Sequence, residues 1–241
     1  MALFMGAFFC FSISFAQNKS QKIEELLNKY QDYDQFNGSA LVANDGEVIF
    51  ADGFGMANME YDIPNTPETK HRLGSITKQF TAALILQLVE QGKLELDQPI
   101  SKYLPDYKGP AAEKVTIHQL LTHSSGIPSY TSFPGFFDEY SRDPYTPAEF
   151  VKIFADSTLQ FTPGEKFSYN NSGYFLLGYI IEDVTGKPYE QVLQENILEP
   201  LNMKNTGYDH HATILKNRAS GYEKNGNGYI NAPYLDMSIP Y

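Results

Sequence analysis

The sequence has a single cysteine, Cys10, and no tryptophan among its 241 residues. One cysteine cannot form a disulfide within the chain, so we expect no disulfide framework. None of the five histidines shows compact ligand spacing such as HExxH, and we therefore expect neither a metal site nor a cofactor. A Gly-x-Ser-x-Gly sequence is also missing, which disfavours an α/β-hydrolase.

The chain also lacks any cluster of lysine or arginine, because its net charge of −11 is spread along the sequence. This distribution argues against nucleic acid and anionic membranes as partners. No internal repeat or linker divides the chain, and its length suits one large domain or a domain with a helical insertion.

Charged side chains are absent from residues 1–16, an apolar run that ends in small residues before Gln17. This pattern is typical of a secretory signal peptide and is too short for a membrane span. We therefore expect removal of residues 1–16, including Cys10, and export of residues 17–241 to a periplasm or the exterior. No stable membrane insertion is expected after that removal.

The remaining sequence predicts a mixed α and β protein. Apolar residues between Ile23 and Tyr30 have helical spacing. Residues 39–44 and 47–50 predict a hairpin, because Asp45-Gly46 between them suits a tight turn. A buried helix is expected to follow, ending at Gly92.

Residues 94–205 predict a mainly helical subdomain. Thr116 and Thr146 each have capping-box spacing at a helix start, and Gly126 and Gly186 are plausible helix stops. Residues 124–145 contain three prolines and several aromatics, which indicates a structured loop. Beyond them, residues 174–184 predict a strongly apolar helix, and residues 224–228 predict a turn between short extended segments.

Candidate chemistry begins at Ser75 and Lys78, three residues apart at the start of an apolar helix. Positions i and i+3 share a helix face, so the Lys78 amine can reach the Ser75 oxygen. Residues 80–89 are apolar except for a threonine and a glutamine, which predicts a helix buried on most sides. Burial favours the neutral amine that a general base beside a serine nucleophile requires. The alternative is an ordinary solvated helix start.

A second pair, Tyr169 and Asn171, stands just before the predicted helix 174–184. Both side chains can point into one cavity, and together with Ser75 and Lys78 they suggest a catalytic group. The alternative is a core tyrosine followed by a helix cap at Asn171 or Ser172.

Taken together, these motifs resemble the serine β-lactamase and penicillin-binding superfamily, especially its class C-like branch of β-lactamases, D-alanyl-D-alanine carboxypeptidases, D-aminopeptidases and esterases. The resemblance covers about residues 35–210, and its matching stretches appear in family order at 71–78, 99–105, 120–126, 161–164, 169–174 and 199–203. It implies an α+β, β-lactamase/transpeptidase-like fold, in which helices and a mainly helical subdomain flank an antiparallel sheet.

The resemblance also implies roles for individual residues. Ser75 would be the acylated nucleophile, with its backbone N–H as an oxyanion donor, and Lys78 its base or proton carrier. Tyr169 would pass a proton to the leaving group, and Asn171 would hold a substrate amide and orient Lys78. Which of Lys78 and Tyr169 is the acylation base stays open.

Members of this superfamily carry a third motif, Lys or His followed by a small residue and glycine, far beyond the tyrosine. Lys224-Asn225-Gly226 matches in letters, but it comes too early and inside a predicted turn. We therefore expect the C-terminal strands and helix to be missing from this chain, and we expect weak or no activity from it.

Two functional classes stay open at this point. The first is an exported serine hydrolase that acts on a β-lactam, a D-Ala-D-Ala-type peptide or an ester. The second is a penicillin-binding or sensor module of the same fold without turnover. In either class Tyr130 and Phe137 are candidates to line a substrate cleft, and His123 is expected to order a loop rather than transfer protons.

Overall fold

The computed structural model describes residues 7–226 and 228–239, with side chains from residue 19 onward. Residues 1–6 of the expected signal peptide therefore lie outside the described range. The chain divides into two compact units, of which the first holds the residues up to His71 together with Ile214–Ala232. The second unit holds Arg72–Thr213 and the segment from Pro233. No helix of the described part is both long and apolar enough for a membrane span.

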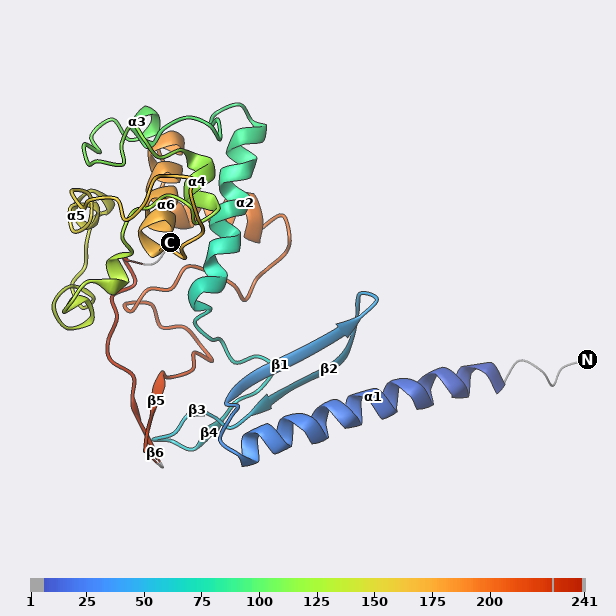
Figure 1. Ribbon diagram of the computed structural model, residues 1–241. Coiled ribbons are helices and arrows are strands. Elements are labelled where there is room, and N and C mark those ends of the chain that lie inside the picture. The colour runs from blue at the N-terminus through green and yellow to red at the C-terminus, as the bar shows by residue number, and fades with distance from the viewer. Residues whose placement is uncertain (1–6, 227, 240–241) are drawn as a thin grey trace, which may run out of the picture. The chain divides into compact units, whose positions relative to one another are not determined.

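In the first unit, helix α1 (Ala7–Asp32) contacts the antiparallel hairpin of β1 (Gly38–Asn44) and β2 (Glu47–Phe54) (Figure 1). The predicted helix and hairpin are both confirmed. At the turn, Asp45 and Gly46 have φ angles of 51° and 83°, the positive values that a tight hairpin turn needs.

Strand β2 continues beyond the predicted end at Phe50, because Gly38–Leu41 pair with Ala51–Phe54 across the hairpin. The register shifts between Val42 and Ala43, where a β-bulge or irregularity interrupts the pairing. The pairing of β1 therefore extends through Gly38, and the hairpin is longer than the predicted ranges 39–44 and 47–50.

Two further strand pairs complete the first unit: β3 (Met56–Asn58) with β4 (Ile63–Pro64), and β5 (Tyr222–Asn225) with β6 (Gly228–Asn231). The predicted turn near residue 226 is confirmed, since Asn225 pairs with Gly228 and Gly226 has a φ of 60°. Residue 227 lies outside the described residues. The Tyr222 hydroxyl accepts a hydrogen bond from the Met59 backbone N–H at 2.8 Å, which joins the late hairpin to the early strands.

The second unit is built around helix α6 (Asn171–Thr185), nine of whose residues are buried. It packs against α2 (Thr77–Glu90), α4 (Ile117–Leu121) and α7 (Tyr189–Leu193). Figure 1 shows α2 and α4 beside α6. A helix that is apolar on all sides is stable only when neighbours cover it, so the core lies here. The other helical segments are η1 (Gly74–Ile76), α3 (Ile100–Tyr103), η2 (Tyr130–Ser132), η3 (Phe136–Tyr140), α5 (Pro147–Val151) and η4 (Gln194–Leu198).

Capping boxes start two of these helices as the sequence predicts. The Thr116 side chain accepts from the Gln119 N–H at α4, and the Thr146 side chain accepts from the Glu149 N–H at α5. The predicted stop at Gly186 is also confirmed, because it follows α6 in the left-handed conformation with a φ of 66°.

The prediction that Gly126 ends a helix is wrong. Helix α4 ends at Leu121, where His123 takes the left-handed conformation with a φ of 54° and Ser124 N–H bonds back to Gln119 O at 2.9 Å. This is a Schellman motif with histidine in the position that glycine usually occupies. Gly126 lies in the following loop, where a Cβ atom would come within 2.4 Å of the Phe161 carbonyl oxygen.

Helix α2 is less enclosed than the sequence predicts. Its fully buried residues, Thr81, Leu84, Ile85 and Leu88, form one face, whereas Leu86 is 51% exposed. The buried face is anchored by a 2.8 Å hydrogen bond between the hydroxyls of Thr81 and Tyr189. At the start of α2, Thr77 and Lys78 are half-buried and Gln79 is exposed, so this end of the helix can present functional side chains.

Candidate active site

Ser75 lies in the short 3₁₀ turn η1, which runs directly into α2. Gly74 before it has a φ of 55°, a left-handed conformation that glycine adopts without a steric penalty. Ser75 is exposed, and Lys78 in the first turn of α2 is half-buried. The backbone therefore sets the hydroxyl at the surface and the amine just beneath it.

Tyr169 and Asn171 are placed by the start of α6. The N-cap is Asn170, whose side-chain oxygen accepts from the Gly173 N–H at 2.6 Å. The sequence alternative of a cap at Asn171 or Ser172 is therefore wrong. Because Asn170 is the cap, the amide of Asn171 is left to bind elsewhere.

The four residues singled out by the sequence come together. The Tyr169 hydroxyl donates to Ser75 Oγ at 2.7 Å, and Lys78 Nζ donates to Asn171 Oδ1 at 2.8 Å. Lys78 Nζ also lies 5.1 Å from the centroid of the Tyr169 ring. The hydroxyl of Ser75 is therefore bound by the phenol, and the Lys78 amine lies next to the same phenol.

The environment of Tyr169 favours its ionised form. Burial raises the pKa of the Tyr169 phenol, but its contacts with Lys78 and Ser75 and the positive charge of Lys78 outweigh burial. The pKa of Tyr169 therefore lies below its ordinary value of 10.0. A larger fraction of Tyr169 is then phenolate, the form that can accept a proton from a neighbouring alcohol.

His123 supports the tyrosine from the end of α4. Its ring centroid is 4.6 Å from that of Tyr169 and 4.9 Å from that of Tyr174. Burial lowers the pKa of His123, and the charge of Lys78 lowers it further. The neutral ring accepts the Asn170 N–H at Nδ1, 3.1 Å away, which assigns its own proton to Nε2.

The two predicted cleft residues are placed differently from each other. Tyr130 is only 7% exposed and packs its ring against Phe136, Phe150 and Phe154, where burial raises the pKa of its phenol. That position gives its side chain almost no surface for a substrate, which does not support the expected role. Phe137 is 58% exposed, and its part in substrate binding stays a prediction.

Sequence reasoning missed two hydroxyl residues of this site. Thr131 Oγ1 accepts from Asn171 Nδ2 at 3.0 Å, and Ser129 Oγ accepts from the Asn171 backbone N–H at 3.1 Å. Both flank Tyr130, in the loop that the sequence marked as structured. Two small hydroxyl residues on either side of an aromatic were the available signal, but they are too common in loops to be specific.

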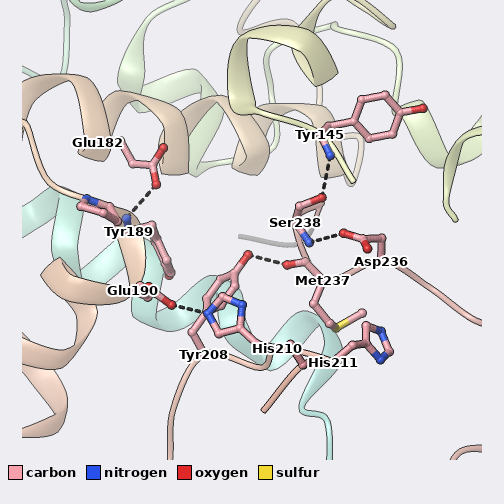
Figure 2. A pocket seen from close by; sticks show the side chains of 12 residues that line it. Tyr145, Glu182, Tyr189, Glu190, Tyr208, His210, His211, Asp236, Met237 and Ser238 are labelled. Carbon is pink, nitrogen blue, oxygen red and sulfur yellow. Dashed lines mark hydrogen bonds and ion pairs between the residues drawn. The ribbon is translucent and has the colours of Figure 1, made fainter. Parts of the chain in front are cut away.

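A separate cavity of about 430 Å³ lies in the same unit and shares no lining residue with the Ser75 group (Figure 2). Its polar groups bind other protein groups. Glu182 accepts from the Tyr189 N–H at 2.7 Å, Glu190 pairs with His210, and Asp236 accepts from the Ser238 N–H at 2.9 Å. We therefore assign the candidate active site to the Ser75 group and not to this cavity. Among the described residues, no group of three or more His, Cys, Asp or Glu is arranged to hold a metal ion.

Comparison with known proteins gives a consistent result. A family model described as Beta-lactamase matches residues 22–241. The putative penicillin-binding protein PbpX of Bacillus subtilis (strain 168) is 34% identical over 227 residues, which are 93% of this chain and 54% of PbpX. This chain thus spans about half the length of that curated relative.

Two solved structures are also similar. A penicillin-binding protein from Bacillus halodurans has a TM-score of 0.76 at 33% identity, covering 89% of this chain and 66% of its own. A D-stereospecific amidohydrolase from Streptomyces sp. has a TM-score of 0.61 at 34% identity, covering 70% and 54%. The chain therefore belongs to the β-lactamase family of serine hydrolases and penicillin-binding proteins, with its α+β, β-lactamase/transpeptidase-like fold.

Proposed function

We propose that this chain carries the acylation centre of a serine hydrolase, with Ser75 as the nucleophile that forms an acyl-enzyme. The observation that carries the proposal is the 2.7 Å hydrogen bond between Tyr169 and Ser75 Oγ, with Lys78 next to the same phenol. A serine hydroxyl is a weak nucleophile until a neighbouring base takes its proton. Tyr169 contacts this hydroxyl directly, and Lys78 lies beside Tyr169.

In the acylation step, Ser75 Oγ attacks the substrate carbonyl carbon while its proton passes to the Tyr169 oxygen or the Lys78 amine. An Oγ–C bond forms, the bond from that carbon to the leaving nitrogen or oxygen breaks, and the leaving atom takes up the proton. Water then attacks the acyl carbon and gives its proton to the same groups, and the Oγ–C bond breaks as that proton passes to Ser75 Oγ, which restores the hydroxyl. The Ser75 backbone N–H is the proposed oxyanion donor.

The proposed substrates are β-lactams, D-Ala-D-Ala-type peptides and esters. Support for amide substrates comes from the similar Streptomyces protein, which is described as a D-stereospecific amidohydrolase, and from the penicillin-binding relatives. All three substrate groups present a carbonyl carbon to one nucleophile, so a single centre serves them. Binding groups around the centre then decide which is preferred.

The test incubates the chain with a fluorescent penicillin and, separately, with p-nitrophenyl acetate, and follows adducts by intact mass. Ser75→Ala removes the nucleophile, and Ser157→Ala makes the same change at a serine outside the site as a matched control. We expect labelling of the parent chain and the control, and none of Ser75→Ala.

The outcomes separate the functional classes. A burst of product followed by turnover supports a hydrolase, and its rate also tests the expected weak activity of this chain. A lasting Ser75 adduct with no turnover supports the alternative, a penicillin-binding or sensor module. Labelling that persists in Ser75→Ala, or no adduct with either reagent, would overturn the proposal.

A further inference from the structure

Thr131 binds the side-chain amide of Asn171 at its nitrogen, the end opposite the oxygen that binds Lys78, and Ser129 is hydrogen-bonded to Thr131. Thr131 Oγ1 accepts from Asn171 Nδ2 at 3.0 Å, while Asn171 Oδ1 accepts from Lys78 Nζ at 2.8 Å. The hydroxyls of Ser129 and Thr131 are 3.0 Å apart and hydrogen-bonded to each other. A continuous chain of hydrogen bonds therefore runs from Ser129 through Thr131 and Asn171 to the amine.

The direction of these hydrogen bonds matters because the side-chain amide of Asn171 has one accepting atom, Oδ1, and one donating atom, Nδ2. If the amide turned over, its NH₂ group would face the Lys78 amine and two donors would meet. Lys78 selects the observed orientation because its ammonium can only donate, and Thr131 completes that orientation by accepting from the NH₂ group at the other end of the amide. In this orientation the Thr131 hydroxyl can donate its own proton to Ser129 Oγ, so every hydrogen bond in the series has one donor and one acceptor.

The segment that carries Thr131 is fixed to the start of α6. Ser172 Oγ donates to the Pro128 carbonyl at 2.7 Å and accepts the Tyr130 N–H at 2.9 Å. The ring of Tyr130, the residue before Thr131, is buried against Phe136, Phe150 and Phe154, which fixes this segment to the core. The hydroxyl of Thr131 is thus held at a fixed place relative to Asn171.

We propose that Thr131, supported by Ser129, is a positioning residue that fixes the Asn171 amide with its oxygen toward Lys78. The inference rests on the proposed function of Ser75, because the amine matters only if it handles the proton of that hydroxyl. Thr131 acts through Asn171 and touches no reacting atom. It is therefore distinct from the groups already assigned roles in acylation.

The test measures acylation of Ser75 by p-nitrophenyl acetate in three variants. Thr131→Val replaces the hydroxyl with a methyl group of similar size, Thr131→Ser keeps the hydroxyl, and Thr158→Val makes the same change at an exposed threonine. We expect Thr131→Val to lower the acylation rate constant about tenfold, the scale of one hydrogen bond lost in the transition state. The half-saturating ester concentration is expected to stay within about twofold, since this ester has no amide for Asn171 to hold. Thr131→Ser and Thr158→Val are expected to match the parent chain.

A second readout does not depend on activity. The side-chain NH₂ signals of Asn171, assigned in an amide NMR spectrum by their loss in Asn171→Ala, report the hydrogen bond to Thr131 directly. We expect these signals to move in Thr131→Val and to stay in place in Thr131→Ser and Thr158→Val. Thermal unfolding of each variant checks that the fold is retained.

The results separate this inference from the proposed function. If Thr131→Val acylates at the parent rate, or if Thr131→Ser is slowed as much as Thr131→Val, the positioning role is overturned and the nucleophile stands. If the parent chain forms no adduct, the proposed function fails, and the NMR signals alone decide the orientation of the amide. Signals that do not move in Thr131→Val then overturn the inference, and signals that move support it.

Discussion

Tyr169 contacts the candidate nucleophile and the candidate proton carrier through different parts of its side chain. Its hydroxyl donates to Ser75 Oγ at 2.7 Å, and its ring lies under Lys78 Nζ at 5.1 Å. The ring of His123 supports it at 4.6 Å. One phenol thus links the hydroxyl to the amine, which makes Tyr169 the most informative single position for a substitution.

Tyr169→Phe removes only the phenolic oxygen, and we expect the rate of Ser75 acylation by p-nitrophenyl acetate to fall about 10²- to 10⁴-fold, the usual contribution of a general acid or base. The sign of the pH effect follows from the lowered pKa of Tyr169. The phenolate, the basic form, increases as pH rises, so acylation in the parent chain is expected to increase with pH on a limb below pH 10.0. Stopped-flow measurements of the acylation rate at a series of pH values test both the fall in rate and the rising limb.

The matched control is Tyr61→Phe, which makes the same change at a tyrosine that is 78% exposed. Its profile is expected to overlay that of the parent chain. If the rising limb persists in Tyr169→Phe, the titrating base is another group and the assignment to Tyr169 is wrong.

At the scale of elements, two helix ends build the site. Helix α6 begins with Asn170 as its cap, and α4 ends with His123 in the left-handed conformation. The Asn170 N–H donates to the His123 ring, so the two helix ends are directly bonded. Precise placement of Tyr169 therefore depends on both helices ending where they do.

Asn170→Ala is expected to destabilise this arrangement. Asn170 is 3% exposed, and its amide accepts from the Gly173 N–H and donates to the Ile127 carbonyl. Loss of the cap together with an unsatisfied buried carbonyl is expected to lower the free energy of unfolding by about 2–3 kcal/mol. Denaturant unfolding followed by circular dichroism measures the change.

Two further variants test whether loss of the N-cap causes this destabilisation. Asn205→Ala makes the same change at an exposed asparagine and is expected to alter stability by less than about 0.5 kcal/mol. Asn170→Ser keeps an accepting oxygen at the N-cap without a charge but loses the donor to the Ile127 carbonyl, so its stability is expected to lie between those of Asn170→Ala and Asn205→Ala. Equal stability of Asn170→Ala and Asn205→Ala would contradict the stabilising role of Asn170 as the N-cap.

At the scale of the whole molecule, the beginning of the chain carries a separate prediction. Residues 1–16 are uncharged, and α1 extends through the expected cleavage point after residue 16. The end of α1 that would remain includes Gln31, whose side chain accepts from the Gly55 N–H at 3.2 Å. Cleavage would therefore leave this attachment of α1 intact.

Expression in a Gram-negative bacterium tests this prediction. We expect periplasmic protein whose N-terminal sequence begins at Gln17, because a short apolar run ending in small residues is what a signal peptidase processes. Ile13→Arg places a charge in the apolar run and is expected to leave uncleaved protein in the cytoplasm. Recovery of the parent chain with residues 1–16 still attached would argue against a cleaved signal peptide.

The sequence by itself determined the parts of this protein that depend on neighbours along the chain. Ser75 and Lys78 stand three residues apart where η1 runs into α2, and the capping boxes at Thr116 and Thr146 are likewise local. The Tyr169 and Asn171 pair was recognisable from its place before an apolar helix. The hairpin followed from its residue types and the Asp45-Gly46 turn, and the central helix from its apolar run.

Only the tertiary structure decided what depends on distant segments. Thr131 and Asn171 are 40 residues apart in sequence, and their 3.0 Å contact depends on how the intervening chain folds back. Burial of Tyr130 and the choice of Asn170 as the cap have the same origin, since each is selected by neighbours from other segments. Local spacing thus supplied the reactive groups, and long-range packing set the orientation in which they can react.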